Sequence, residues 1–130
     1  MYQKKVAKDT AKVLQSYLTY QAVRTIIDQL SETNPQGAIW LRNYSSKTKI
    51  QNSEEYIQGL MLENKELVMR IMTVRKHLAD EVLEFIPEMV CSGIEQANLE
   101  HRRHLLERLT QSSSASNLPL NDTDRDRSSE

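Results

Sequence analysis

The feature that most constrains the fold is the stretch 65–109, where Pro87 and Gly93 are the only two residues that disfavour a helix interior. As one continuous helix this stretch would be about 67 Å long, whereas a compact chain of this size has a radius of gyration of about 13 Å. Its own chain cannot cover such a helix. We therefore expect Pro87 to bend it, by removing a hydrogen bond and clashing with the Leu83 carbonyl, and another molecule to cover part of it.

The apolar residues of this stretch favour a second copy of the chain as that molecule. They form two adjacent stripes at helical spacing, namely Leu67, Ile71, Val74, Leu78, Val82, Phe85 and Met89, and Val68, Met72, Ala79, Leu83, Ile86, Val90, Ile94 and Ala97. A face this broad exceeds what one neighbouring helix needs, which predicts a homodimer that forms through 65–109. The alternative is a compact four-helix bundle in which the stretch breaks in two at Pro87.

The N-terminal half predicts three more helices, so the expected fold class is an all-α helical bundle. The first covers 4–30, with two apolar stripes: Val6, Thr10, Val13, Tyr17, Tyr20 and Ile27, and Ala7, Leu14, Leu18, Ala22, Ile26 and Leu30. A short second helix ends before a loop over 45–52. Capping residues stand at the later helix starts: Asn34 before Pro35, Ser53 with Glu54 and Glu55, and Asn64 with Glu66.

The last segment, 111–130, differs from the rest of the chain. It contains six Ser and four acidic residues, with only Ala115, Leu118 and Leu120 as apolar residues. Burial in such a segment cannot offset the entropy of ordering it. We therefore predict one helical domain over 1–110, which dimerises through 65–109, followed by a disordered tail over 111–130.

Composition excludes several classes of protein. Lys plus Arg is 17 and Asp plus Glu is 18, which argues against a protein that mainly neutralises phosphates. The longest apolar run, 38–41, is too short to span a membrane, and the start of the chain lacks the apolar core of a signal peptide. A single cysteine, Cys91, excludes an intramolecular disulfide and fits a reducing, intracellular compartment.

No motif for catalysis or cofactor binding is present. The sequence lacks GxSxG, the phosphate-binding GxxxxGK[ST], HExxH and CxxC. His101 and His104 have a spacing that metal sites use, but Arg102 and Arg103 lie between them and place cations where a metal would bind. We expect no enzyme activity, cofactor or metal, and we expect Cys91 to be a buried thiol that packs as a small hydrophobe.

Two tyrosines give the clearest signal for binding. Tyr17 and Tyr20 are three residues apart, so both rings project from one side of the first helix. One interpretation is that they line the edge of the core with solvated hydroxyls. The other is that they form the wall of a groove that holds apolar side chains and bonds the partner's backbone. Ile50 could pin its loop to the bundle or line the same groove.

The charged residues favour no partner by themselves. Five polar groups of mixed type lie near predicted helix ends: Gln29, Glu32, Arg70, Arg102 and Arg103. The basic run at 101–103 could suggest nucleic acid. However, acidic residues interleave with it at Glu95, Glu100 and Glu107, as in pairing between helical turns.

Four long segments resemble RbcX, a cyanobacterial family of assembly chaperones for form I Rubisco. They are AKDTAKVLQSYLTYQAVRTI, SETNPQGAIWL, ENKELVMRIMTVRKHLADEVLEFIPEMV and HRRHLLERLTQ, and the resemblance covers essentially all of 2–111. It implies an all-helical, arc-shaped homodimer whose long bent helices pair antiparallel. It also implies a cytoplasmic, carboxysome-associated protein.

The resemblance also implies a client and its contact residues. The central groove of the family binds the C-terminal peptide of the Rubisco large subunit. The residues that match its groove are Tyr17, Tyr20, Ile50 and Gln51, and those that match its peripheral contacts to the folded large subunit are Gln29, Glu32, Arg70 and Arg102. The function implied is ATP-independent assembly of the large-subunit core. Two alternatives are a structural helical-bundle interaction protein and a DNA-binding helical regulator.

Overall fold

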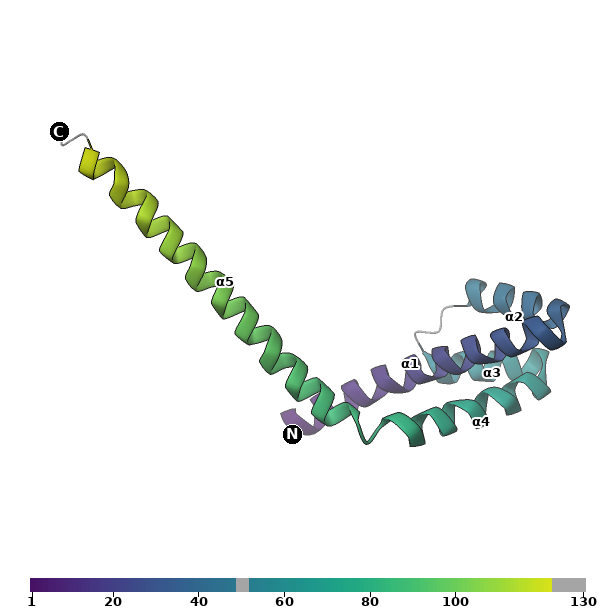
Figure 1. Cartoon of the computed structure of the whole chain (residues 1–130). Helices are drawn as coiled ribbons and strands as arrows, with labels where there is room; N and C mark the ends of the chain where they lie inside the picture. The colour runs from purple at the N-terminus through teal and green to yellow at the C-terminus, as the bar shows by residue number, and fades with distance from the viewer. Residues whose placement is uncertain (49–51, 123–130) are drawn as a thin grey trace. The chain divides into compact units, whose positions relative to one another are not determined.

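The protein is all-α, as predicted (Figure 1). The computed structural model describes the backbone of residues 1–48 and 52–122, and in those ranges all side chains except those of 114–122. The described ranges contain no strand. The helices are α1 (Tyr2–Thr33), α2 (Pro35–Lys47), α3 (Ser53–Glu63), α4 (Lys65–Val82) and α5 (Ile86–Asp122).

The chain divides into two compact units, where the sequence predicted a single domain over 1–110. The first unit, Met1–Glu84, contains α1 to α4, and the second, Phe85–Glu130, contains α5. The division falls at residues 83–85, which form a turn between α4 and α5. The predicted interruption of the long helix near Pro87 is therefore confirmed.

Pro87 lies in the first turn of α5 rather than inside a helix. The N–H groups of a first helical turn have no partner within the helix, so a residue without an N–H costs little there. Helical bonding ends with the Leu83 N–H on the Ala79 oxygen and resumes with the Met89 N–H on the Phe85 oxygen, both at 3.1 Å. The proline thus sets where the second helix starts.

Asparagine caps begin three of the helices. The side-chain oxygens accept hydrogen bonds from the N–H three residues on: Asn34 from Gly37 at 3.2 Å, Asn52 from Glu55 at 3.3 Å and Asn64 from Leu67 at 3.1 Å. The predicted caps Asn34 and Asn64 are confirmed. For α3 the cap is Asn52, because the Ser53 hydroxyl donates instead to Glu54 at 2.8 Å.

The core of the first unit lies between the second half of α1 and the other three helices. α1 packs against α2, α3 and α4, and α3 packs against α4. The buried apolar residues are Ala22, Val23, Ile26, Ile27, Leu30, Ala38, Leu41, Tyr56, Ile57, Leu60, Leu67, Val68 and Ile71. The stripes predicted for the first helix are buried from Ala22 onward. Towards the start of α1, however, Val6 and Val13 are 45% and 68% exposed.

α2 continues further than the sequence predicted. Residues 45–47 are helical, so the predicted loop over 45–52 is wrong for them. Aromatic packing on α3 stabilises this extra turn, because the Tyr44 ring stacks on Trp40 and tilts against Tyr56. The Ser45 and Tyr56 hydroxyls are also bonded at 2.7 Å. Residues 49–51 lie outside the described part of the chain.

α5 exposes a series of large apolar side chains. Met89, Val90 and Ile94 are each more than half exposed, as are Leu99, Leu105, Leu106 and Leu109. Cys91 is exposed as well, so the prediction of a buried thiol is wrong for this chain. The apolar spacing marks the apolar face of α5, but no other described helix of the second unit covers this face.

The helix continues through 111–122, where the sequence predicted a disordered tail. Adding a residue to an existing helix costs far less than starting one, so a Ser-rich segment can extend the helix without a core of its own. The rest of the predicted tail, 123–130, lies outside the described residues.

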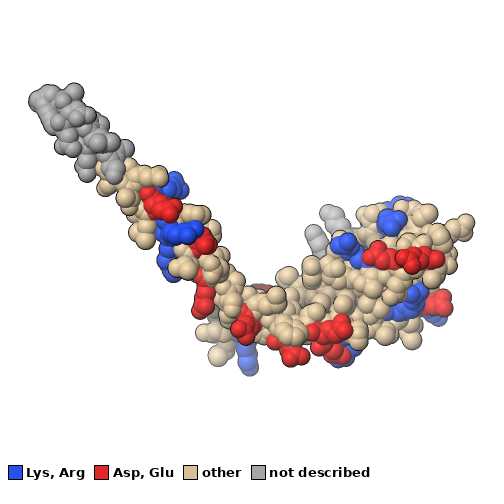
Figure 2. All heavy atoms as spheres, in the orientation of Figure 1, with Lys and Arg blue, Asp and Glu red and all other residues tan. Residues whose placement is uncertain are grey.

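Surface charge is mixed along α5. Basic and acidic side chains alternate on its visible face (Figure 2), and Arg103 pairs with Glu100 at 2.7 Å. The sequence predicted pairs four residues apart for the basic run, whereas this pair is three residues apart. Within the described helices, no segment is long and apolar enough to cross a membrane.

Candidate functional site

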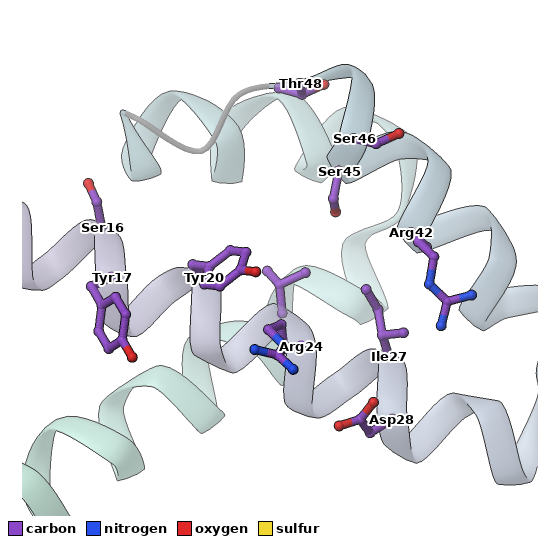
Figure 3. Close-up of a pocket in the computed structure, with 11 residues that line it drawn as sticks. Ser16, Tyr17, Tyr20, Arg24, Ile27, Asp28, Arg42, Ser45, Ser46 and Thr48 are labelled. Atoms are coloured by element: carbon purple, nitrogen blue, oxygen red, sulfur yellow. The ribbon is translucent and has the colours of Figure 1, made fainter.

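A groove of about 740 Å³ lies between α1 and the C-terminal half of α2, and we call it the α1–α2 groove. Figure 3 shows Tyr20 projecting from α1 into this space and Ser45 facing it from α2. The lining residues are Ser16, Tyr17, Tyr20, Val23, Arg24, Ile27, Asp28, Arg42, Ser45, Ser46 and Thr48. All of them belong to the first unit.

The groove combines an apolar floor with an aromatic wall. Val23 and Ile27 are 2% and 9% exposed and belong to the core, whereas Tyr17 and Tyr20 are 57% and 44% exposed. The two tyrosines come together because their spacing puts them on one face of α1. Both rings line the groove and neither is buried, which is compatible with the groove interpretation and with a core edge whose hydroxyls are solvated.

The other predicted groove residues, Ile50 and Gln51, lie outside the described residues. Thr48, the last described residue before them, caps the C-terminal end of α2 and lines the α1–α2 groove.

Three charged residues of the groove were not singled out from the sequence. Arg24 lies 6.0 Å above the centre of the Tyr20 ring, a cation–π contact, and Asp28 and Arg42 also line the groove. For Arg24 a signal was available, because it is four residues from Tyr20 and so lies on the same helical face. For Arg42 the sequence contained no such signal, since only the packing of α2 on α1 brings this residue into the groove.

Two of the four predicted peripheral residues are in contact. Arg70 on α4 donates a hydrogen bond to the Gln29 side-chain oxygen on α1, at 2.8 Å. Glu32 is exposed near the end of α1, and Arg102 is exposed on α5, in the second unit. The sequence did not predict the bond between Gln29 and Arg70, because the two residues are 41 positions apart.

A polar network on another side of α1 ties three helices together. The Glu54 carboxylate, at the start of α3, accepts two hydrogen bonds from the Arg75 guanidinium on α4, at 2.8 and 3.1 Å. It also accepts from Gln15 on α1 and from Ser53, both at 2.8 Å. Arg75 donates in addition to the hydroxyl of buried Thr19, at 3.1 Å. Chiefly through the bonds from Arg75, the pKa of Glu54 is lowered from its ordinary value of 4.5 to about 2, against the opposing effect of burial.

This network predicts a loss of stability in acid. A carboxyl whose pKa is lower in the folded chain stabilises the fold fully above its unfolded value, near pH 4.5, and loses that contribution as the pH falls towards 2. Nearly half of the Glu54 side chain is exposed, so solvent screening limits the contribution to about 1 kcal/mol. We expect Glu54→Gln to lower the urea midpoint at neutral pH, and the difference from wild type to shrink as the pH falls below 4.5.

Glu55→Gln is the matched control. It removes an exposed carboxylate from the same helical turn without touching Arg75. Urea titrations at several pH values measure the effect. A Glu54→Gln deficit that stays constant down to the acid limit would contradict the assignment of the network.

Among the described side chains, no three His, Cys, Asp or Glu groups come together in a way that could hold a metal ion. His101 and His104 lie on α5 with two arginines between them. The α1–α2 groove itself combines apolar, aromatic and charged side chains.

Comparisons with known proteins agree on one family. The family model described as RbcX protein matches residues 1–111. The RuBisCO chaperone RbcX of Picosynechococcus sp. is 66% identical over 113 residues, which cover 87% of this chain and 84% of that protein. The RuBisCO chaperone RbcX of Nostoc sp. is 54% identical over 129 residues, which cover 95% and 97%.

A solved structure extends the agreement to the fold. A crystal structure of RbcX in complex with substrate matches with a TM-score of 0.81 and 65% sequence identity, and the match covers 85% of this chain and 99% of that one. The matched family model, the two relatives and the common fold together identify this chain as a member of the RbcX family.

Proposed function

We propose that this chain is an ATP-independent assembly chaperone for Rubisco, which binds the C-terminal peptide of the large subunit and promotes assembly of the large-subunit core. The observation that supports this most directly is the α1–α2 groove, whose apolar floor and exposed tyrosines suit an extended peptide with aromatic side chains. The relatives named RuBisCO chaperone and the substrate complex of a solved relative support the same client.

The working form is a homodimer. The chaperone domain covers 1–110, and the dimer forms through 65–109, where the apolar side chains of α5 are exposed in the single chain. Covering such a face with a second copy removes the apolar surface from water, which is the main favourable term in association.

The dimer gives a direct prediction of mass. Light scattering at low micromolar concentration should report about twice 15.1 kDa. Ile94→Asp, which puts a charge on the exposed apolar stripe, is expected to lower that mass. Glu95→Lys, which changes a charge on the polar side of α5, away from both apolar stripes, should not. A folded wild-type monomer would contradict the architecture.

Two surfaces of the chain have different functions. The α1–α2 groove, with Tyr17, Tyr20, Ile50 and Gln51, holds the client peptide. The peripheral residues Gln29, Glu32, Arg70 and Arg102 contact the folded body of a large subunit and so stabilise subunit pairs whose apolar surface would otherwise aggregate. Release occurs by mass action when core assembly favours other contacts, without nucleotide hydrolysis.

The experiment that tests this function is co-purification with the Rubisco large subunit. The tagged chain is expected to retain the full-length large subunit and to lose it when the C-terminal peptide of that subunit is deleted. A large subunit whose C-terminal peptide has a scrambled sequence is the control for length and composition. Equal retention of the intact and deleted subunits would overturn the peptide-binding proposal.

A further inference from the structure

The α1–α2 groove is lined by two guanidinium groups that have no acidic partner within the described residues. Arg24 lies over the face of the Tyr20 ring, and among the described residues neither Arg24 nor Arg42, on the α2 wall, forms an ion pair. Elsewhere Arg75 pairs with Glu54 and Arg103 with Glu100. Within the described residues the groove therefore holds two guanidinium groups and one carboxylate, Asp28, which leaves an excess of hydrogen-bond donors that a carboxylate of a ligand would complement.

The spacing along α1 matches that of an extended peptide. Tyr20 and Arg24 are four residues apart, which is about 6 Å along the helix axis. Side chains on one face of an extended chain repeat every two residues, about 6.6 to 6.8 Å. The guanidinium carbon of Arg24 lies 6.0 Å from the centre of the Tyr20 ring, which is close to one such step. A ligand side chain held at Tyr20 would bring the next side chain of the same face to Arg24.

The length of the groove limits the number of peptide residues that it can bind. From Tyr17 to Asp28 the lining covers about 16 Å of α1. At about 3.3 Å per residue this accommodates about five residues of extended chain. Asp28, one turn beyond Arg24, places a negative charge where a second acidic side chain would be repelled.

We propose that Arg24, supported by Arg42, is a specificity-determining residue that selects a client segment with a carboxylate two residues from its aromatic anchor. This inference rests on the proposed function and deepens it, because it defines the charge pattern of the peptide that the groove accepts. A guanidinium can bond a carboxylate through two parallel N–H groups, whereas it repels a basic side chain in the same place.

The test uses the C-terminal peptide of the Rubisco large subunit, labelled for fluorescence anisotropy. Three versions carry Glu, Gln or Lys two residues from the aromatic anchor. We expect wild type to bind the Glu version about tenfold more tightly than the Gln version at low salt, equivalent to about 1.4 kcal/mol. The Lys version should bind more weakly still, and added salt should reduce the differences.

Protein variants assign the effect to Arg24. Arg24→Gln is expected to bind the Glu and Gln versions equally, and Arg24→Lys to restore part of the preference. Lys65→Gln is the matched control, since it removes one exposed positive charge outside the groove and should keep the full preference. Arg42→Gln should show a smaller loss of preference.

The possible failures are distinguishable. If wild type binds none of the versions, the proposed function fails and this inference fails with it. If wild type binds all three versions equally, the chaperone function stands and the selection by charge is wrong. If Arg24→Gln instead lowers the mass of the dimer while the peptide preference is unchanged, Arg24 contacts a second copy of the chain and the inference is overturned.

Discussion

Tyr20→Ala is expected to abolish binding of the isolated C-terminal peptide of the Rubisco large subunit, with a loss of about a hundredfold or more at both low and high salt. The ring supplies the exposed aromatic wall of the α1–α2 groove and is the surface over which Arg24 lies. Burial of apolar area is a short-range effect that salt does not screen, so the loss should persist at any ionic strength. Anisotropy titrations at two salt concentrations measure it.

The peripheral residues should behave in the opposite way. Arg102→Ala and Arg70→Ala are expected to leave peptide affinity nearly unchanged but to impair assembly of the large-subunit core on native gels. Added salt should mimic this defect, because partly solvated charges are screened over a Debye length of about 8 Å at physiological salt.

Tyr2→Ala is the matched control for the groove, since it removes a tyrosine of the same helix that is 78% exposed and lies outside the lining. If Arg102→Ala weakens the peptide as much as Tyr20→Ala does, the groove and the peripheral residues are one site. The division into two surfaces would then be wrong.

Ile71→Asp is expected to unfold the first unit. Ile71 is 0% exposed and lies in the core where α4 packs on α1 and α3. A carboxylate there would be buried without a partner, at a cost above about 4 kcal/mol, which is comparable with the whole stability of a small domain. Circular dichroism and urea titration should show the loss of a cooperative transition.

Two further variants keep this prediction testable if Ile71→Asp is insoluble. Ile71→Ala leaves a cavity and should lower stability by about 2 to 5 kcal/mol. Met69→Asp introduces the same charge at a residue of α4 that is 62% exposed and should be tolerated. A cooperative transition of wild-type stability in Ile71→Asp would contradict the core described above.

Local features were predictable wherever a few neighbouring residues decide them. Asn34 and Asn64 cap helices because a short polar side chain reaches the N–H three residues on. Pro87 marks the start of α5 because it lacks an N–H. The tyrosine pair lies on one face because helical geometry requires it.

Predictions that depended on a distant neighbour were less successful. Val13 has the spacing of a buried residue but is exposed, because apolar periodicity marks a face and does not say what covers it. Cys91, predicted to be buried from its residue type, is exposed as well. Residues 45–47 are helical because Tyr44 and Ser45 contact Tyr56, which belongs to the next helix.

The helical class, the caps Asn34 and Asn64, the break near Pro87 and the aromatic face of α1 were predictable from the sequence, since each follows from interactions within about one turn of helix. Only the tertiary structure decided which polar groups meet. Glu54 bonds Arg75 across 21 residues, and Arg75 bonds Thr19 across 56. Arg42 lies in the groove because α2 folds back on α1. The reason is physical: helical periodicity sets the direction of a side chain around its own axis, whereas its partner depends on how separate helices pack.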